Sequence, residues 1–140
     1  MTYGSIVHDP AGRLDTHLPL DREPNERLAA VVLDWRQDEH LPPQADIEQT
    51  ALQLTGYARL LVHEVRTKAA ALPRDGHASA VAARTLAQIT ATEADRRLSA
   101  PPLPTRHSLR AAQSRARLVS ALHCALDRIL AAVPASVPGP

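Results

Sequence analysis

The clearest hydrophobic pattern in this chain lies between Asp46 and Leu72. Apolar residues recur there at alternating steps of four and three, at Ile47, Ala51, Leu54, Ala58, Leu61 and Val65. This spacing places them along one side of an α-helix, as in the seams that pack against a nearly parallel helix. Asp46, followed three residues later by Gln49, predicts a capping box at the helix start, and Pro73 ends the helix.

Three further segments predict helices with one apolar side. The first runs from Arg22 to about Asp38, and its stripe consists of Leu28, Val31, Val32 and Trp35. The next runs from His77 to about Leu98, and its expected inward residues are Ala78, Val81, Ala82, Leu86 and Ile89. The last follows Thr105 and continues to about Val133, with its candidate core at Leu109, Ala112, Ala116, Val119, Leu122, Leu126, Ile129 and Leu130.

These elements predict an all-α fold, a four-helix up-down bundle in which one short helix precedes three long ones. The connections at 73–76 and 101–104 are short, which favours antiparallel neighbours. Residues 21–133 form a single helical domain in this interpretation, between an irregular lead at 1–20 and a loose Pro-rich tail at 134–140. The chain has no Phe, so Ala, Leu and Val must fill the core by close helix approach, which leaves little room for bulky ligands.

The charge of the chain is divided between its two parts. Residues 1–50 carry ten Asp and Glu against four Arg, a net charge of −6. Residues 51–140 carry eleven Arg and one Lys against five Asp and Glu, a net charge of +7. We therefore expect the acidic first helix to dock on the basic remainder, either in the same chain or in a dimer mate.

The sequence disfavours several classes of protein. Cys124 is the only cysteine, so an internal disulfide and a thiolate metal cage are excluded. The N-terminal segment lacks a basic stretch followed by an apolar one, and no apolar run approaches the ~20 residues of a bilayer-spanning helix. We expect a cytoplasmic protein.

Several sequence pieces occur in an order that is typical of one family. They are Leu41-Pro42-Pro43, Leu52-x-Leu-Thr-Gly-Tyr57, Leu60-Leu61-Val62-His63-Glu64-Val65, Ala71-Leu72-Pro73, Ala94-x-x-Arg97-Leu98, Ala116-Arg117-Leu118-Val119 and Ala121-Leu122-His123. Through them the chain resembles, from Leu41 to about Ile129, an uncharacterised actinobacterial family of small helical natural product biosynthesis proteins. The resemblance implies a cytoplasmic protein associated with secondary-metabolite gene clusters, and it carries over no catalytic residue.

The chain departs from this family at two places. Family members usually have His where Tyr57 stands, and they have a His-Tyr-Glu-like end near Ala125–Asp127. If those histidines serve a site in the family, this chain lacks part of it.

Few residues are candidates for catalysis or metal binding. No Glu-x-x-His or His-Glu-x-x-His spacing occurs, so we expect no metal and no cofactor. Cys124 is expected to be a small packed hydrophobe rather than a nucleophile. An alternative remains in which His63, Glu64 and His123 converge in an interhelical pocket. Glu64 also has the i,i+4 spacing of a surface ion pair with Lys68.

The last predicted helix carries a row of positive charge. Arg106, Arg110 and Arg117 fall on one side of it at steps of four and seven, with no acid before Asp127. This row predicts a face that binds an anion or an acidic partner. The alternatives are a solvated surface or a face covered by the acidic part of the chain. Trp35 is expected in the core, with a partner hot spot as its alternative.

We therefore predict a non-catalytic helical accessory or regulatory protein that binds a protein partner or a second copy of itself. A small enzyme or substrate-binding protein with the interhelical pocket is the second hypothesis. A DNA-associated regulator ranks third, because the net charge of +1 and the lack of interleaved aromatic residues disfavour nucleic-acid binding.

Overall fold

The computed structural model of the chain describes residues 22–37, 39–73, 77–101 and 108–133. These residues form four helices and no strand: α2 Arg22–Asp34, α3 Gln44–Ala70, α4 Ala78–Leu98 and α5 Ser108–Ala132. The predicted all-α four-helix fold is therefore confirmed. The predicted lead at 1–20 and tail at 134–140 lie outside the described residues.

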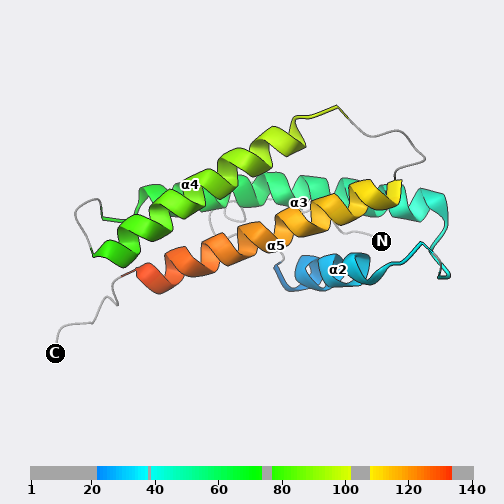
Figure 1. The fold of residues 1–140 in the computed structure, drawn as a ribbon, viewed down its shortest axis with the longest axis horizontal. Helices are drawn as coiled ribbons and strands as arrows, with labels where there is room; N and C mark the ends of the chain where they lie inside the picture. The colour runs from blue at the N-terminus through cyan, green and yellow to red at the C-terminus, as the bar shows by residue number, and fades with distance from the viewer. Residues whose placement is uncertain (1–21, 38, 74–76, 102–107, 134–140) are drawn as a thin grey trace, which may run out of the picture.

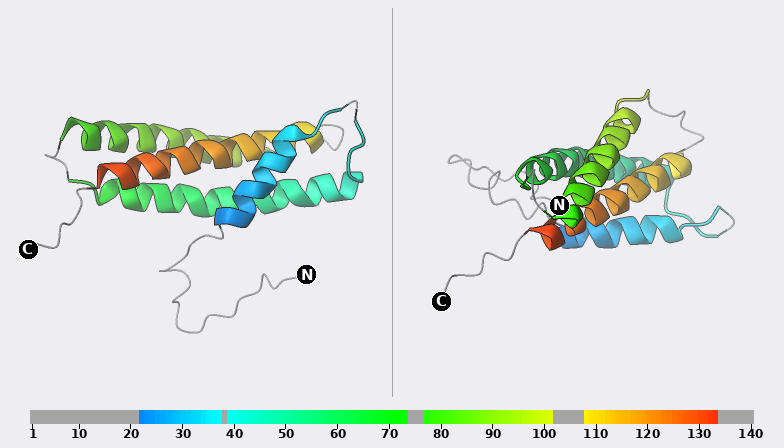
Figure 2. Two further views of the ribbon diagram at one scale, coloured as in Figure 1. Left: turned by 90° about the horizontal axis from the view of Figure 1, so that it is seen from below. Right: turned by 60° about the vertical axis from the view of Figure 1, so that its left-hand side comes forward.

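The three long helices form one bundle, and the short helix lies across it. α3 and α5 run in the same direction and α4 runs the opposite way, as an up-down-up connection requires (Figure 1). α2 crosses the bundle obliquely, mainly over α5 and with a smaller contact to α3 (Figure 2). The core lies between the three long helices. Helix α2 packs on the outside of this bundle, mainly against α5.

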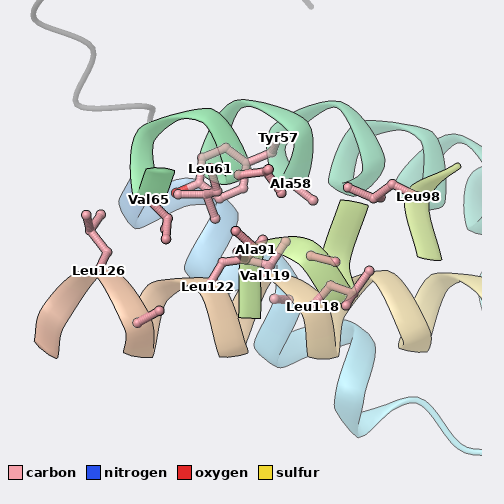
Figure 3. Close-up of a cluster of buried hydrophobic side chains, with 14 of the residues drawn as sticks. Tyr57, Ala58, Leu61, Val65, Ala91, Leu98, Leu118, Val119, Leu122 and Leu126 are labelled. Carbon is pink, nitrogen blue, oxygen red and sulfur yellow. The ribbon is translucent and has the colours of Figure 1, made fainter. Parts of the chain in front are cut away.

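The hydrophobic seam of α3 is the centre of the core. Five of the six predicted residues are buried, and Ala51 is half-buried. Figure 3 shows Leu61 of α3 and Leu122 of α5 in one cluster of apolar side chains. The 27 residues of α3 make a helix of about 40 Å, long enough to contact both α4 and α5.

The predicted capping box of α3 is wrong. The helix begins at Gln44, directly behind Pro43, and no side chain caps it. The carbonyl oxygen of Pro43 instead accepts hydrogen bonds from the amides of Asp46, at 2.9 Å, and Ile47, at 3.1 Å. Pro43 occupies the N-cap position and its ring has no oxygen that could accept a hydrogen bond, so the helix starts without a side-chain cap.

The inward face of α4 also differs from the prediction. Val81, Leu86 and Ile89 are 42%, 43% and 61% exposed, and Ala78 and Ala82 are exposed as well. The buried face is made almost entirely of alanine: Ala80, Ala83, Ala87, Ala91, Ala94 and Leu98. Small side chains let α4 approach both α3 and α5 closely, and the larger apolar residues are left on the outer side.

The core face of α5 matches the prediction at six of its eight residues. Leu130 is 52% exposed, Leu109 is half-buried, and the remaining six are buried. Leu118 and Ala125 add to this face. The predicted cap Thr105 lies outside the described residues.

Helix α2 ends at Asp34, four residues earlier than predicted. It buries Ala29 and Val32, while the predicted Val31 is 52% exposed. Gln113 of α5 holds the end of α2, because its side-chain amide donates to the carbonyl oxygens of Val32, at 3.2 Å, and Trp35, at 2.8 Å. These carbonyls belong to the last turn of α2 and its exit, where the i+4 amides of the helix are no longer in place; that of Val32 also accepts from the amide of Trp35 at 3.1 Å.

The expected docking of α2 on the basic part of the chain occurs within one chain, but not for the expected reason. In the segments that the structure describes, the arginine–carboxylate pair across the interface joins Arg22 of the acidic part to Asp127 of the basic part, at 2.8 Å. Its sign is the reverse of the predicted attraction. Arg110 and Arg117 remain exposed, so α2 does not cover them.

Candidate functional site

Two buried polar side chains meet in the interior between α3 and α5. The Tyr57 hydroxyl oxygen lies 2.6 Å from Nε2 of His123, and the two rings meet edge to face with centroids 5.5 Å apart. Only 5% of Tyr57 and 4% of His123 are exposed. We assign the ring proton of the neutral imidazole to Nδ1, which faces the Glu26 carboxylate at 3.8 Å, so that the Tyr57 hydroxyl donates to Nε2.

Charged residues of α2 and α5 surround the other edge of this imidazole. Nδ1 of His123 lies 3.8 Å from a carboxylate oxygen of Glu26. Arg22 forms a bidentate pair with Asp127, with distances of 2.8 and 2.9 Å, and lies 3.6 Å from Glu26. We call Arg22, Glu26, Tyr57, His123 and Asp127 the His123 cluster.

The cluster sets the charge state of its members. Burial lowers the pKa of His123 below its ordinary value, and Arg22 adds to this shift, while Glu26 and Asp127 oppose it. The hydrogen bonds from Arg22 lower the pKa of Asp127. Because His123 is neutral and its Nε2 accepts from Tyr57, the cluster joins α2, α3 and α5 without presenting an exposed base.

A cleft of about 220 Å³ between α2 and α5 opens next to the cluster. His123, Ser120 and Cys124 line it from α5, and Arg22 and Glu26 line it from α2. The prediction that Cys124 is packed in the core is wrong, because the thiol is exposed. Its neighbours His123 and Ala125 face inward, and the helical turn of about 100° per residue directs Cys124 outward.

The predicted triad of His63, Glu64 and His123 is not assembled at this cleft. His63 is exposed on α3, and Glu64 pairs with Lys68 at 3.9 Å, the surface pair that its spacing indicated. Neither residue lines the cleft that holds His123. The partner that His123 has instead is Tyr57, a residue that the sequence singled out only as a departure from the family pattern.

No group of three or more His, Cys, Asp or Glu side chains in the described segments is arranged to hold a metal ion. Within the same segments, no helix has the length and apolar character needed to cross a membrane.

The predicted row of arginines lies on the outer side of α5. Arg110 and Arg117 are exposed, and Arg106 lies outside the described residues. Arg128 continues the row, because its spacing of eleven residues from Arg117 returns to the same side of the helix. Among the described residues, no carboxylate lies within ion-pair distance of Arg110, Arg117 or Arg128. We call these three residues the α5 arginine row.

Trp35 lies at the exit from α2. It is half-buried and packs against the core, as expected for the single large ring of the chain. Its carbonyl oxygen accepts the Gln113 hydrogen bond described above. These contacts anchor α2 on α5 and leave part of the indole ring accessible.

Comparison with known proteins assigns the chain to one family. The model of a family of unknown function, DUF6415, matches residues 25–132, and the chain belongs to this family. The match spans α2 to α5, the helices that form the bundle. No curated protein and no solved structure matches the chain.

Proposed function

We propose that the protein is a non-catalytic accessory or regulatory protein of an actinobacterial natural-product pathway, acting in the cytoplasm. The pathway assignment rests on the sequence resemblance given above. The binding role rests on one observation, the α5 arginine row.

The α5 arginine row has the character of a binding surface. Most other exposed guanidinium groups in the described segments have carboxylate neighbours, as in the Arg27–Glu23 pair at 3.0 Å and the Arg97–Glu93 pair at 2.9 Å. The exception is Arg59, which donates a hydrogen bond to the carbonyl oxygen of Leu98 at 3.2 Å. The row has no carboxylate neighbour among the described residues, although the chain as a whole is nearly neutral. Guanidinium groups bind carboxylates in bidentate geometry, so we assign the row to an acidic protein partner.

The test replaces two arginines of the row by Glu in the full chain, as Arg110→Glu with Arg117→Glu. Both side chains are exposed and opposite the core, so the variant should fold and retain its helical circular dichroism spectrum. The matched control is Arg27→Glu with Arg36→Glu, two exposed arginines near the α2 end of the chain that give the same change in net charge. Each protein is used as bait in the producing cell, and captured partners are purified for direct binding measurements.

The expected partner has an acidic binding surface, is lost by the α5 variant and is kept by the control. Its affinity should fall as ionic strength rises, because exposed charges are screened. Identical partner lists for wild type and α5 variant would refute the proposal. Steeply salt-dependent binding of duplex DNA through the same two arginines would replace it with the DNA-associated regulator.

We also propose weak self-association through the outer face of α4, because large apolar side chains remain exposed there. Val81 and Ile89 lie on one line of the helix, one turn on either side of Thr85. An antiparallel pairing centred on Thr85 would place Val81 against Ile89 of a second copy, as two-fold symmetry requires. One helix face offers less than the ~800 Å² per partner of a standard interface, so the dimer should form only at high concentration.

Sedimentation over a wide range of protein concentration tests this pairing. Ile89→Asp should keep the chain monomeric at every concentration, whereas Gln53→Asp, which adds the same charge at an exposed position of α3, should behave as wild type. Wild-type protein that remains monomeric at millimolar concentration would exclude the dimer.

A further inference from the structure

A second and larger cleft lies at the opposite end of the bundle from the α3–α4 connection. The C-terminal end of α4 diverges there from α3 and α5 (Figure 1). The cleft has a volume of about 460 Å³ and is lined by the first half of α3, the end of α4 and the first half of α5. The sequence predicted a core with little room for bulky ligands. The cleft is compatible with that prediction, because it lies where the helix ends separate and not inside the alanine-packed core.

The cleft has mostly apolar walls and one arginine without an ion-pair partner among the described residues. Glu48 also lines the cleft, and its carboxylate accepts hydrogen bonds from the side chains of Gln44, at 2.9 Å, and Ser108, at 3.4 Å. Ala51, Leu52 and Ala111 contribute to the apolar walls, and Arg115 reaches the cleft from α5. Nε of Arg115 donates a hydrogen bond to the Thr55 hydroxyl at 3.1 Å. Among the described residues, no carboxylate lies within ion-pair distance of this guanidinium.

The surroundings of Arg115 disfavour its charge. Burial lowers its pKa, and the neighbouring Arg59 lowers it further, while no acidic group compensates. A partly desolvated cation is costly unless an anion accompanies it. The other arginine that lines the cleft, Arg97, already has Glu93 as its partner at 2.9 Å.

We propose that this cleft binds a small organic anion, an oxyanion group carried on an apolar body, with Arg115 receiving the oxyanion. A volume of 460 Å³ falls in the range of small-molecule sites, which are mostly apolar with a few polar groups that fix orientation. The guanidinium group of Arg115 can donate two hydrogen bonds to a carboxylate or a phosphate, and the apolar walls can contact the remainder of the ligand. This site is separate from the α5 arginine row, because Arg115 faces α3 whereas the row faces solvent.

The experiment titrates the full chain with octanoate and octyl phosphate, and with octanol as the uncharged probe. Binding is followed by the NMR signals of the arginine Nε–H groups and by thermal unfolding. Wild-type protein should bind at least one anion, with shifts at Arg115, and should bind octanol about tenfold more weakly or worse. Tighter binding of octanoate assigns a carboxylate ligand, and tighter binding of octyl phosphate assigns a phosphate.

Three variants locate the site. Arg115→Met should weaken anion binding by about tenfold or more and raise the unfolding temperature of the free protein, because it removes the uncompensated charge. Arg27→Met, the same change at an exposed position of α2 outside both proposed sites, should alter neither. Ala111→Leu leaves Arg115 in place and narrows the cleft, so it should weaken binding even if Arg115→Met fails to fold. Equal affinity for octanol, unchanged binding in Arg115→Met or Ala111→Leu, or no binding at millimolar anion would overturn the proposal.

Discussion

His123 is the residue whose chemistry depends most on its position. Its neutral ring accepts a hydrogen bond from Tyr57 and is held in a buried site, and both facts disfavour its protonated form. The unfolded chain exposes the same ring to water. Folding therefore excludes a proton that the unfolded chain takes up near pH 6.5.

This difference predicts how stability depends on pH. Because the folded pKa of His123 is lowered, the free energy of unfolding should be at its plateau above about pH 6.5 and should fall as pH decreases toward the folded pKa. Asp127 adds a second loss below about pH 3.8, since its pKa is also lowered by Arg22. Urea unfolding at several pH values between 4.5 and 7.5, a range chosen around the ordinary His pKa of about 6.5, measures the first slope.

The slope belongs to His123 if one substitution removes it. His123→Gln should flatten the dependence between about pH 5 and 6.5, whatever its effect on overall stability. His63→Gln, at an exposed position of α3, should leave the wild-type slope in place. An unchanged slope in His123→Gln would mean that another group causes it.

At the scale of the element, α4 is the helix whose buried side could not be predicted from the hydrophobic pattern. Apolar residues occur all around this helix, so their positions do not distinguish an inner from an outer side. The predicted inward set contains Val81, Leu86 and Ile89, whose larger side chains would gain more from burial than alanine does. Contact with two helices at once favours the side with the smallest residues, and that preference depends on the tertiary arrangement. In α3 the apolar and polar sides differ clearly, and its seam was predictable.

The alanine face of α4 should not tolerate larger side chains. Ala91 is fully buried in the shared core of the three long helices, so Ala91→Leu forces the helices apart and should lower stability by about 1–3 kcal/mol. Ala82→Leu makes the same change at an exposed position of the same helix and should change stability by less than about 0.5 kcal/mol. Urea unfolding of both variants decides whether the face is packed, because equal effects would place α4 in another orientation.

Helix α3 contains a glycine that the bundle does not require. Gly56 is exposed in mid-helix, and a β-carbon built on it meets no atom within 4 Å. Gly56→Ala should therefore raise the free energy of unfolding by roughly 0.5–1 kcal/mol, since alanine restricts the unfolded chain and favours the helix. Urea unfolding measures the gain. A loss of stability would show that the backbone at Gly56 is closer to its neighbours than the fold indicates.

At the scale of the whole molecule, the distribution of charge predicted that the two parts of the chain associate, but not which residues make the contact. The −6/+7 division correctly indicated that the acidic part docks on the basic part, yet the contact that forms joins Arg22 to Asp127. Net charge describes a long-range field, whereas the docked position depends on which side chains fit together. The helical spacing left Arg115 off the side that Arg110 and Arg117 share, but it did not indicate what Arg115 contacts. The surroundings of Arg115 arise only where α4 diverges from the bundle.

Apolar packing rather than charge should therefore hold α2 on the bundle. Arg22 and Asp127 are both partly exposed, and such pairs contribute about 0–1 kcal/mol. Val32 is fully buried against the core, so Val32→Ala should lower the free energy of unfolding by about 2 kcal/mol. Val31→Ala removes the same two methyl groups from the exposed side of α2 and should have almost no effect.

The comparison of these two adjacent valines decides how α2 docks. Urea unfolding gives the loss of stability, and limited proteolysis between α2 and α3 reports whether α2 detaches before the bundle unfolds. In Val32→Ala we expect faster cleavage in that connection, with α3, α4 and α5 still resistant. If Asp127→Asn, which disrupts the ion pair, releases α2 as readily as Val32→Ala does, then charge holds the helix and the apolar account is wrong.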